Sequence, residues 1–106
     1  MACWQSHWER YMGLRFWDGS YLQVEEALVV RAFAIVKVRY NYHYQRADST
    51  LVFRYDNAPH HPEVSTHPHH VHVGERVEPA EPPDLSDVLH EIDGLLYPTG
   101  KETEQR

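Results

Sequence analysis

The sequence contains a single cysteine, Cys3, which excludes an internal disulfide bond and a zinc site built on several cysteines. No apolar run reaches the roughly 18 residues that a membrane-spanning helix needs. The first ten residues contain no apolar segment of the signal-peptide type. We therefore expect a cytoplasmic protein that is neither exported nor inserted into a membrane. Its 106 residues suffice for one domain, which we place at residues 1–98, followed by a disordered tail at 99–106.

The formal net charge of −6 is unevenly distributed along the chain. Residues 27–72 contain five Lys/Arg against three Asp/Glu, together with seven of the nine histidines. Residues 73–106 contain three Lys/Arg against nine Asp/Glu. A neutral to positive middle segment can attract a phosphate backbone despite the acidic total. A solvated acidic C-terminal segment without any partner accounts for the same distribution equally well.

Alternating apolar residues predict four strands in the first half of the chain. The first covers Tyr11–Phe16, and Asp18-Gly19 after it is a favoured tight turn because glycine tolerates positive φ. The alternation resumes at Leu22–Val24 in a second strand. Ala27–Gln45 is rich in β-branched and aromatic residues and predicts a third, longer strand, and Leu51–Asp56 predicts a fourth.

The two faces of the third and fourth strands differ in character. Tyr42 and Tyr44 share one face of the third strand, and His43 lies on the other. Arg54 and Asp56 share one face of the fourth strand. A hairpin of the two strands would give His43 and Arg54 a common polar face, provided that the register is right, because a slip of one residue inverts every side chain.

The second half of the chain combines an irregular segment with a helix. Asn57–Pro83 contains six of the seven prolines and should hold little regular structure. From Asp84, a suitable helix cap, apolar residues recur with helical spacing until Pro98 ends the pattern. The expected fold is therefore α+β: a small antiparallel sheet of about four strands with the C-terminal helix packed on one face.

Five sequence blocks connect the chain to a known family. They are DGSYLQV, YNYHYQ, FRYDNAPHHPE, THPHHVHVG and DLSDVLHEI, in this order. In order and spacing they resemble the TumE-like toxins of prokaryotic toxin–antitoxin pairs, over roughly residues 14–96. Three features depart from the family pattern: His67 replaces a Phe, Val71 replaces a Lys, and the amino terminus is short and lacks the helix that usually precedes the first strand. The missing Lys removes one cation for phosphate contact near the histidines.

The resemblance implies a toxin that inhibits growth and is neutralised by an antitoxin protein with a helix-turn-helix DNA-binding domain. The residues themselves fit a ribonuclease that works without a metal or other cofactor. Two histidines near one phosphate can serve as general base and general acid, and an arginine fork can stabilise the charge that develops. An aspartate can orient a histidine, and tyrosine rings can stack on unpaired bases. The candidate catalytic residues are His43, Arg54, Asp56, His60, His61, His69, His70 and His72, and the candidate substrate-binding residues are Arg39, Tyr42, Tyr44, Tyr55 and Asn57.

Several other interpretations remain open. The pairs His67/His69 and His70/His72 each place two imidazoles on one side of an extended segment, which suits a metal-binding protein or metal-dependent hydrolase. The residues that could complete such a site are His60, His61, Asp56 and Glu63. A non-catalytic binding module is the third possibility. For individual residues, the tyrosines are ordinary strand-packing residues in most sheets, Arg54 and Asp56 can simply pair with each other, and Asn57 can serve a turn.

Overall fold

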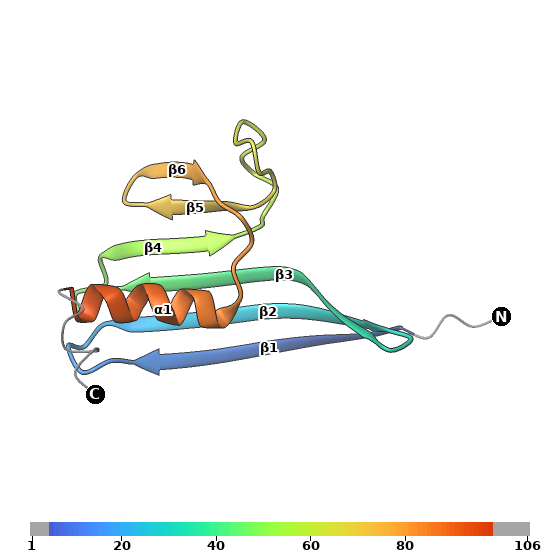
Figure 1. Ribbon diagram of the computed structural model, residues 1–106, viewed down its shortest axis with the longest axis horizontal. Coiled ribbons are helices and arrows are strands. Elements are labelled where there is room, and N and C mark those ends of the chain that lie inside the picture. Colours follow the sequence, from blue (N-terminus) through green and yellow to red (C-terminus); the bar gives the residue numbers. More distant parts are fainter. Residues whose placement is uncertain (1–4, 99–106) are drawn as a thin grey trace.

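The structure, a computed structural model, describes residues 5–98 and shows one antiparallel sheet with a helix lying across it (Figure 1). The strands are β1 (Gln5–Arg15), β2 (Tyr21–Arg31), β3 (Ala34–Gln45), β4 (Leu51–Asp56), β5 (His70–Val73) and β6 (Arg76–Pro79), and the helix is α1 (Leu85–Leu96). The tail predicted at 99–106 lies outside the described residues. Within residues 5–98, no helix combines the length and the apolar character that crossing a membrane requires.

Every strand pairs with its neighbours in sequence, so the sheet order is β1-β2-β3-β4-β5-β6. The predicted α+β class, with an antiparallel sheet and a C-terminal helix, is confirmed. The sheet has six strands rather than about four, because β5 and β6 form within the proline-rich segment that was expected to be irregular. The prolines do not interrupt these strands: Pro68 precedes β5 and Pro79 is the last residue of β6. Gly74, with φ of 60°, makes the turn between them.

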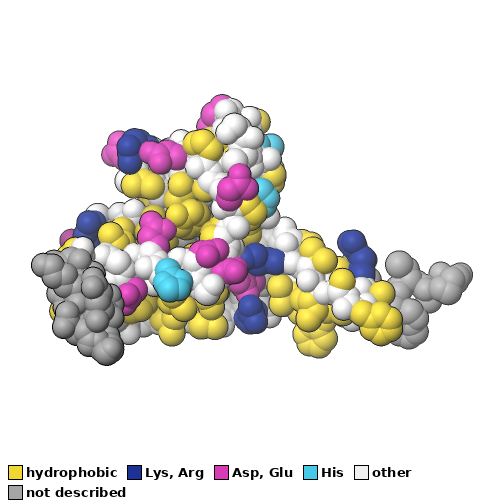
Figure 2. Space-filling view, viewed as in Figure 1, with side chains coloured by type: hydrophobic (Ala, Val, Ile, Leu, Met, Phe, Trp, Pro, Cys, Tyr) yellow, Lys and Arg dark blue, Asp and Glu magenta, His cyan; other side chains and the backbone are white. Residues whose placement is uncertain are grey.

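The long strand predicted over Ala27–Gln45 is the second correction. The chain reverses at Ala32 and Phe33, and β3 begins only at Ala34. Ala32 adopts a φ of 52°. An early break in this strand is compatible with the pattern, but no Gly, Asn or Pro marks its position. The β2–β3 hairpin extends beyond the rest of the molecule together with β1 (Figure 1), and apolar side chains such as Ile35 are exposed along this part of the surface (Figure 2).

The core lies between one face of the sheet and α1. The tyrosines of β3 alternate inward and are almost fully buried, which makes them packing residues. From the helix, Val88 and Ile92 close the core, each only 1% exposed. The buried core cluster comprises Leu22, Val24, Tyr40, Tyr42, Tyr44, Phe53, Val71, Val88 and Ile92.

The helix begins where the sequence predicts. The side chain of Asp84 accepts a hydrogen bond from the backbone N–H of Asp87 at 2.9 Å, and the carboxylate of Asp87 accepts one from the N–H of Asp84 at 3.0 Å. This reciprocal capping box satisfies two backbone donors that the first turn would otherwise leave unpaired. The helix ends at Leu96, two residues before Pro98. The cap thus fixes the point from which α1 crosses the sheet.

A buried carboxylate, Glu26, joins the core to the edge of the sheet. Its Oε2 accepts a hydrogen bond from the Tyr42 hydroxyl and its Oε1 accepts one from Arg10 Nε at 2.9 Å. Burial alone would raise the pKa of Glu26, but the hydrogen bonds from Tyr42 and Arg10 outweigh it and hold the pKa below its usual value of 4.5. The charged carboxylate therefore stabilises the folded state.

Replacing Glu26 with Gln is expected to lower the free energy of unfolding at pH 7 by about 1.5–3 kcal/mol, the range for a hydrogen bond to a charged group. Because the pKa of Glu26 is lower in the folded than in the unfolded state, this stabilisation is present above the unfolded value and disappears as the pH falls through the folded one. Urea denaturation of both proteins across acid pH should show the difference shrinking. Glu25→Gln on the opposite face is the control, and a difference independent of pH would refute the role of the charge.

Candidate functional site

The histidine-rich segment joins the sheet through β5, which pairs with β4. In this register Arg54 is opposite His72, and Asp56 is opposite His70. Directly opposite residues of paired strands point to the same face, so these four side chains lie together on the face that α1 does not cover. His43 of β3 is opposite Arg54 and shares this face, as the sequence predicted.

Asp56 is the centre of the group, and its side chain is only 8% exposed. Its Oδ1 accepts a hydrogen bond from the backbone N–H of Ala58 at 2.9 Å and lies 3.1 Å from His70 Nε2. Its Oδ2 accepts a hydrogen bond from Arg54 Nε at 3.2 Å and lies 3.5 Å from His72 Nε2. The predicted pairing of Arg54 with Asp56 is therefore present. One carboxylate fixes the positions of an arginine and two histidines.

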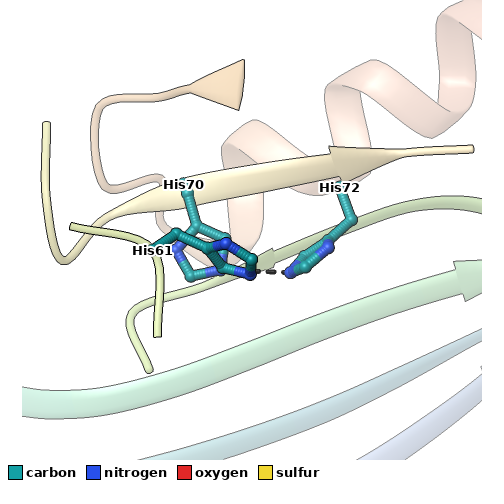
Figure 3. A group of neighbouring side chains, drawn as sticks. All are labelled: His61, His70 and His72. Atoms are coloured by element: carbon teal, nitrogen blue, oxygen red, sulfur yellow. Dashed lines mark hydrogen bonds between the residues drawn. The ribbon is translucent and has the colours of Figure 1, made fainter. Parts of the chain in front are cut away.

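A third histidine, His61, reaches the group from the loop between β4 and β5. Its ring centre lies 5.0 Å from that of His70 and 5.4 Å from that of His72 (Figure 3). The loop is held in place by Thr66, whose hydroxyl donates to the carbonyl of His69 at 2.6 Å and accepts from the N–H of Ala80 at 2.9 Å. One ring nitrogen from each of the three histidines lies within 4.8 Å of the others. We call Arg54, Asp56, His61, His70 and His72 the histidine cluster.

The histidines of β5 differ in exposure and therefore in what they can contact. The side chain of His70 is 1% exposed, whereas those of His72 and His61 are 17% and 29% exposed. Burial lowers the pKa of His72 below its usual value of 6.5, and the guanidinium of Arg54 lowers it further, although Asp56 opposes both. His72 is thus favoured as a neutral imidazole at neutral pH. His70 is buried, so within the cluster the histidines that solvent or a substrate can reach are His72 and His61.

A cavity of about 360 Å³ adjoins the cluster on the open face and shares Arg54 and Asp56 with it. Asn41 lines this cavity, and its side-chain Oδ1 is buried without a hydrogen-bond partner among the described residues. A buried polar atom without a partner is unfavourable, so it marks a place where a ligand donor can bind. The remaining lining residues are Glu9, Tyr11, Glu25, Glu26, Ala27, Arg39, Tyr40 and Ala58.

Three of the predicted catalytic histidines do not join the cluster. His43 lies on the same face, where its Nε2 is 3.0 Å from Gln45 Oε1. His60 is exposed at a turn, and its backbone N–H donates to the carbonyl of Ala58. His69 Nδ1 lies 2.9 Å from the Tyr40 hydroxyl, and the two rings stack. The structure therefore separates neighbours in sequence, His60 from His61 and His69 from His70.

The predicted substrate-binding residues lie in different parts of the structure, and most of them are away from the cavity. Tyr42 and Tyr44 lie in the core, and Tyr55 donates a hydrogen bond to Glu91 of α1, so all three are on the helix side of the sheet. Asn57 binds the backbone of β3: its Oδ1 accepts from the N–H of Tyr40 and its Nδ2 donates to the carbonyl of Val38. Only Arg39 lines the cavity.

Sequence reasoning did not single out Asn41, Tyr11 or Glu25 as site residues. The alternation of β3 did put Asn41 on the face of His43, and this is the signal that could have identified it. Tyr11 and Glu25 are opposite each other on β1 and β2. Which residues of these two strands face the cavity depends on the strand register, and the sequence alone does not fix that register.

Comparison with protein families gives a match to toxin TumE over residues 7–96. The match covers nearly all of β1, the other five strands, α1 and every residue of the histidine cluster. Neither the curated proteins nor the solved structures contain a match.

Proposed function

The chain belongs to the TumE toxin family, and on that premise we propose that it arrests growth by cleaving RNA at the histidine cluster. The observation that carries the proposal is the convergence of Arg54, Asp56, His61 and His72 beside a cavity on an uncovered face of the sheet. Acid–base groups, a fork of cationic donors and room for a ligand are the parts that phosphodiester cleavage requires.

The chemistry assigns a role to each part of the cluster. Attack of a ribose 2′-hydroxyl on the adjacent phosphorus forms the P–O2′ bond and breaks the P–O5′ bond. One proton must leave the 2′-oxygen and another must reach the departing 5′-oxygen. The guanidinium of Arg54, 35% exposed, supplies donors for the negative charge that accumulates on the phosphate oxygens. Asp56 holds Arg54 and His72 in position for these steps.

The sequence predicts that two imidazoles exchange these protons without a metal, and a metal-dependent hydrolase that uses the same histidines is the alternative. His72 and His61 are the exposed imidazoles that either route would use. The two routes differ in whether the imidazoles carry protons or bind an ion. Cleavage of RNA at this cluster is the proposal in both cases.

We assign the cavity to a nucleobase rather than to a phosphate. Four carboxylates line it, those of Glu9, Glu25, Glu26 and Asp56, against the two guanidinium groups of Arg39 and Arg54, and this excess of negative charge disfavours a phosphate. Asn41 Oδ1, which lacks a partner, and the carboxylate of Glu25 both accept hydrogen bonds, so they suit the amino and imino donors of a base. Arg54 at the rim of the cavity would then contact the adjoining phosphate. An RNA target implies that the toxin acts in the cytoplasm.

An antitoxin protein with a helix-turn-helix domain is the partner that the family implies, and we propose it here. A toxin that cleaves RNA must be held inactive in the cell that makes it, and an antitoxin that blocks the histidine cluster would do this. Co-expression of the adjacent gene product should restore growth, and that product should co-purify with the toxin.

Induced expression of the wild-type protein is expected to arrest growth, and His61→Ala should relieve the arrest because it removes an exposed member of the cluster. His60→Ala is the matched control, since His60 lies next to it in sequence but outside the cluster. Growth curves, with immunoblots to confirm equal amounts of protein, measure the effect. Normal growth under strong induction of folded wild-type protein would refute the toxin role, and equal relief by both variants would refute the assigned site.

A further inference from the structure

The contacts of His70 leave one of its nitrogens facing two electron-rich atoms. Its Nδ1 lies 2.9 Å from the carbonyl oxygen of Pro68. A carbonyl oxygen can only accept, so Nδ1 carries a proton, and a neutral ring then has a lone pair at Nε2. That nitrogen lies 3.1 Å from Asp56 Oδ1 and 3.1 Å from His72 Nε2. A lone pair opposite a carboxylate is repulsive unless a cation lies between them or His70 carries a second proton.

The distances among these atoms are compatible with one bound ion. A tetrahedral zinc ion with bonds of 2.0–2.1 Å separates its ligand atoms by about 3.3 Å. The nitrogens of His70 and His72 are 3.1 Å apart, and the oxygens of Asp56 lie 3.1 Å from the first and 3.5 Å from the second. The three side chains therefore already have the spacing of a ligand set.

The outer contacts of the imidazoles follow the pattern of metal ligands. Histidines that bind metals commonly donate their other ring nitrogen to a carbonyl or a carboxylate, which fixes the ring and its tautomer. His70 uses Nδ1 in this way on Pro68, and His61 places Nδ1 3.2 Å from Glu63 Oε2. Nε2 of each ring then remains for an ion. These contacts are independent of the distances within the cluster.

We propose that His61, His70 and His72, together with the carboxylate of Asp56, bind one divalent transition-metal ion. Three imidazole nitrogens and one carboxylate oxygen favour zinc or a similar ion over magnesium, which prefers oxygen ligands. Four protein ligands fill a tetrahedral site, so a water or the 2′-hydroxyl would reach the ion only as a fifth ligand, from the side where His61 and His72 are partly exposed. Activation of such a fifth ligand rests on the proposed RNA cleavage, whereas the binding site itself does not.

The test is titration of untagged, chelator-treated full-length protein with zinc chloride by calorimetry, with cobalt(II) absorption as a second readout. Wild-type protein should bind one ion per chain with a Kd of about 1 μM or lower and gain thermal stability on binding. His72→Ala and His61→Ala should weaken binding at least about 100-fold, the upper end of the effect of losing an outer contact. His60→Ala and His69→Ala should bind like wild type, because neither side chain reaches the cluster.

Zinc binding that survives unchanged in His61→Ala and His72→Ala would show an adventitious site elsewhere and overturn the proposal, as would no binding by wild type. RNA cleavage separates this failure from that of the proposed function. Zinc bound at the cluster without any RNA cleavage supports the metal site and contradicts the ribonuclease. Full cleavage by metal-free protein supports the ribonuclease and contradicts a role of the ion in the reaction, and the titration alone then decides whether the cluster binds zinc.

Discussion

Replacing Ile92 with Asp is expected to abolish the cooperative unfolding of the domain. Ile92 is 1% exposed and is one of only two helix residues in the buried core. Burying an unpaired carboxylate in an apolar site typically costs several kcal/mol, against a total stability of about 5–15 kcal/mol for a domain. Because the helix is one of the two layers that enclose the core, its displacement would expose the tyrosines of β3.

Thermal denaturation followed by near-ultraviolet circular dichroism measures this effect. Leu95→Asp is the matched control, because Leu95 lies on the same helix and is 51% exposed. The control should melt within a few degrees of wild type, and Ile92→Asp should show no cooperative transition. A cooperative transition for Ile92→Asp within a few degrees of wild type would mean that α1 does not close the core in the way described.

Arg54→Lys is expected to slow RNA cleavage by about 100-fold, the typical effect of losing one donor to a developing oxyanion, while KM changes little. Lysine keeps the positive charge but carries its three donors on one nitrogen, so it cannot donate to Asp56 Oδ2 from one nitrogen while other nitrogens of a planar fork bind a phosphate. Single-turnover and steady-state assays on a labelled RNA separate kcat from KM.

Arg76→Lys serves as the control, because Arg76 is an exposed arginine paired with Glu78 on β6. It should cleave like wild type. A rise in KM without a fall in kcat for Arg54→Lys would make Arg54 a binding residue only. Unchanged kinetics would remove it from the site.

Most of the sheet could be predicted from local sequence patterns. Alternation located β4, the Asp18-Gly19 pair located the first turn, and Asp84 located the start of α1, each because a local backbone preference agrees with the final fold. The shared face of His43 and Arg54 was expected from a hairpin of β3 and β4, but their direct pairing depends on a register that the sequence left open. These features depend on residues close together in the chain.

The strands β5 and β6 could not be predicted because their signals are short and are flanked by prolines. Each has four residues, and a pattern of four residues in a proline-rich segment is typical of a loop. The turn at Ala32 could not be located because the β-type pattern is strong and continuous on both sides of it. The pairing of β2 with β3 nevertheless requires the chain to reverse there. In both places strand pairing outweighs local preference.

Which histidines belong to the site depends on the pairing of β5 with β4. The sequence identified a region dense in histidine but did not distinguish His61 from His60 or His70 from His69. That distinction arises because β5 pairs with β4 in one register and puts His70 and His72 beside Asp56. The tyrosines were ambiguous for a related reason, since either face of β3 could have been the core.

The predicted metal-independent reaction and the proposed metal site give opposite outcomes in a chelator. If the three imidazoles bind an ion that activates the nucleophile, RNA cleavage should disappear in excess EDTA and return with one divalent ion. If imidazoles alone exchange the protons, cleavage should persist in EDTA and depend on pH with a bell-shaped profile. The contacts of His70 favour the first outcome.

Cleavage of an end-labelled RNA by purified, untagged, zinc-loaded protein tests the central claim most directly, with His61→Ala and His60→Ala beside wild type. The account predicts that wild type and His60→Ala cleave at equal rates and that His61→Ala is slower by about 100-fold or more, because only His61 belongs to the cluster. Equal cleavage by all three proteins would contradict the assigned site. No cleavage by a wild-type protein that still arrests growth would contradict the ribonuclease and indicate a toxin that acts by binding alone.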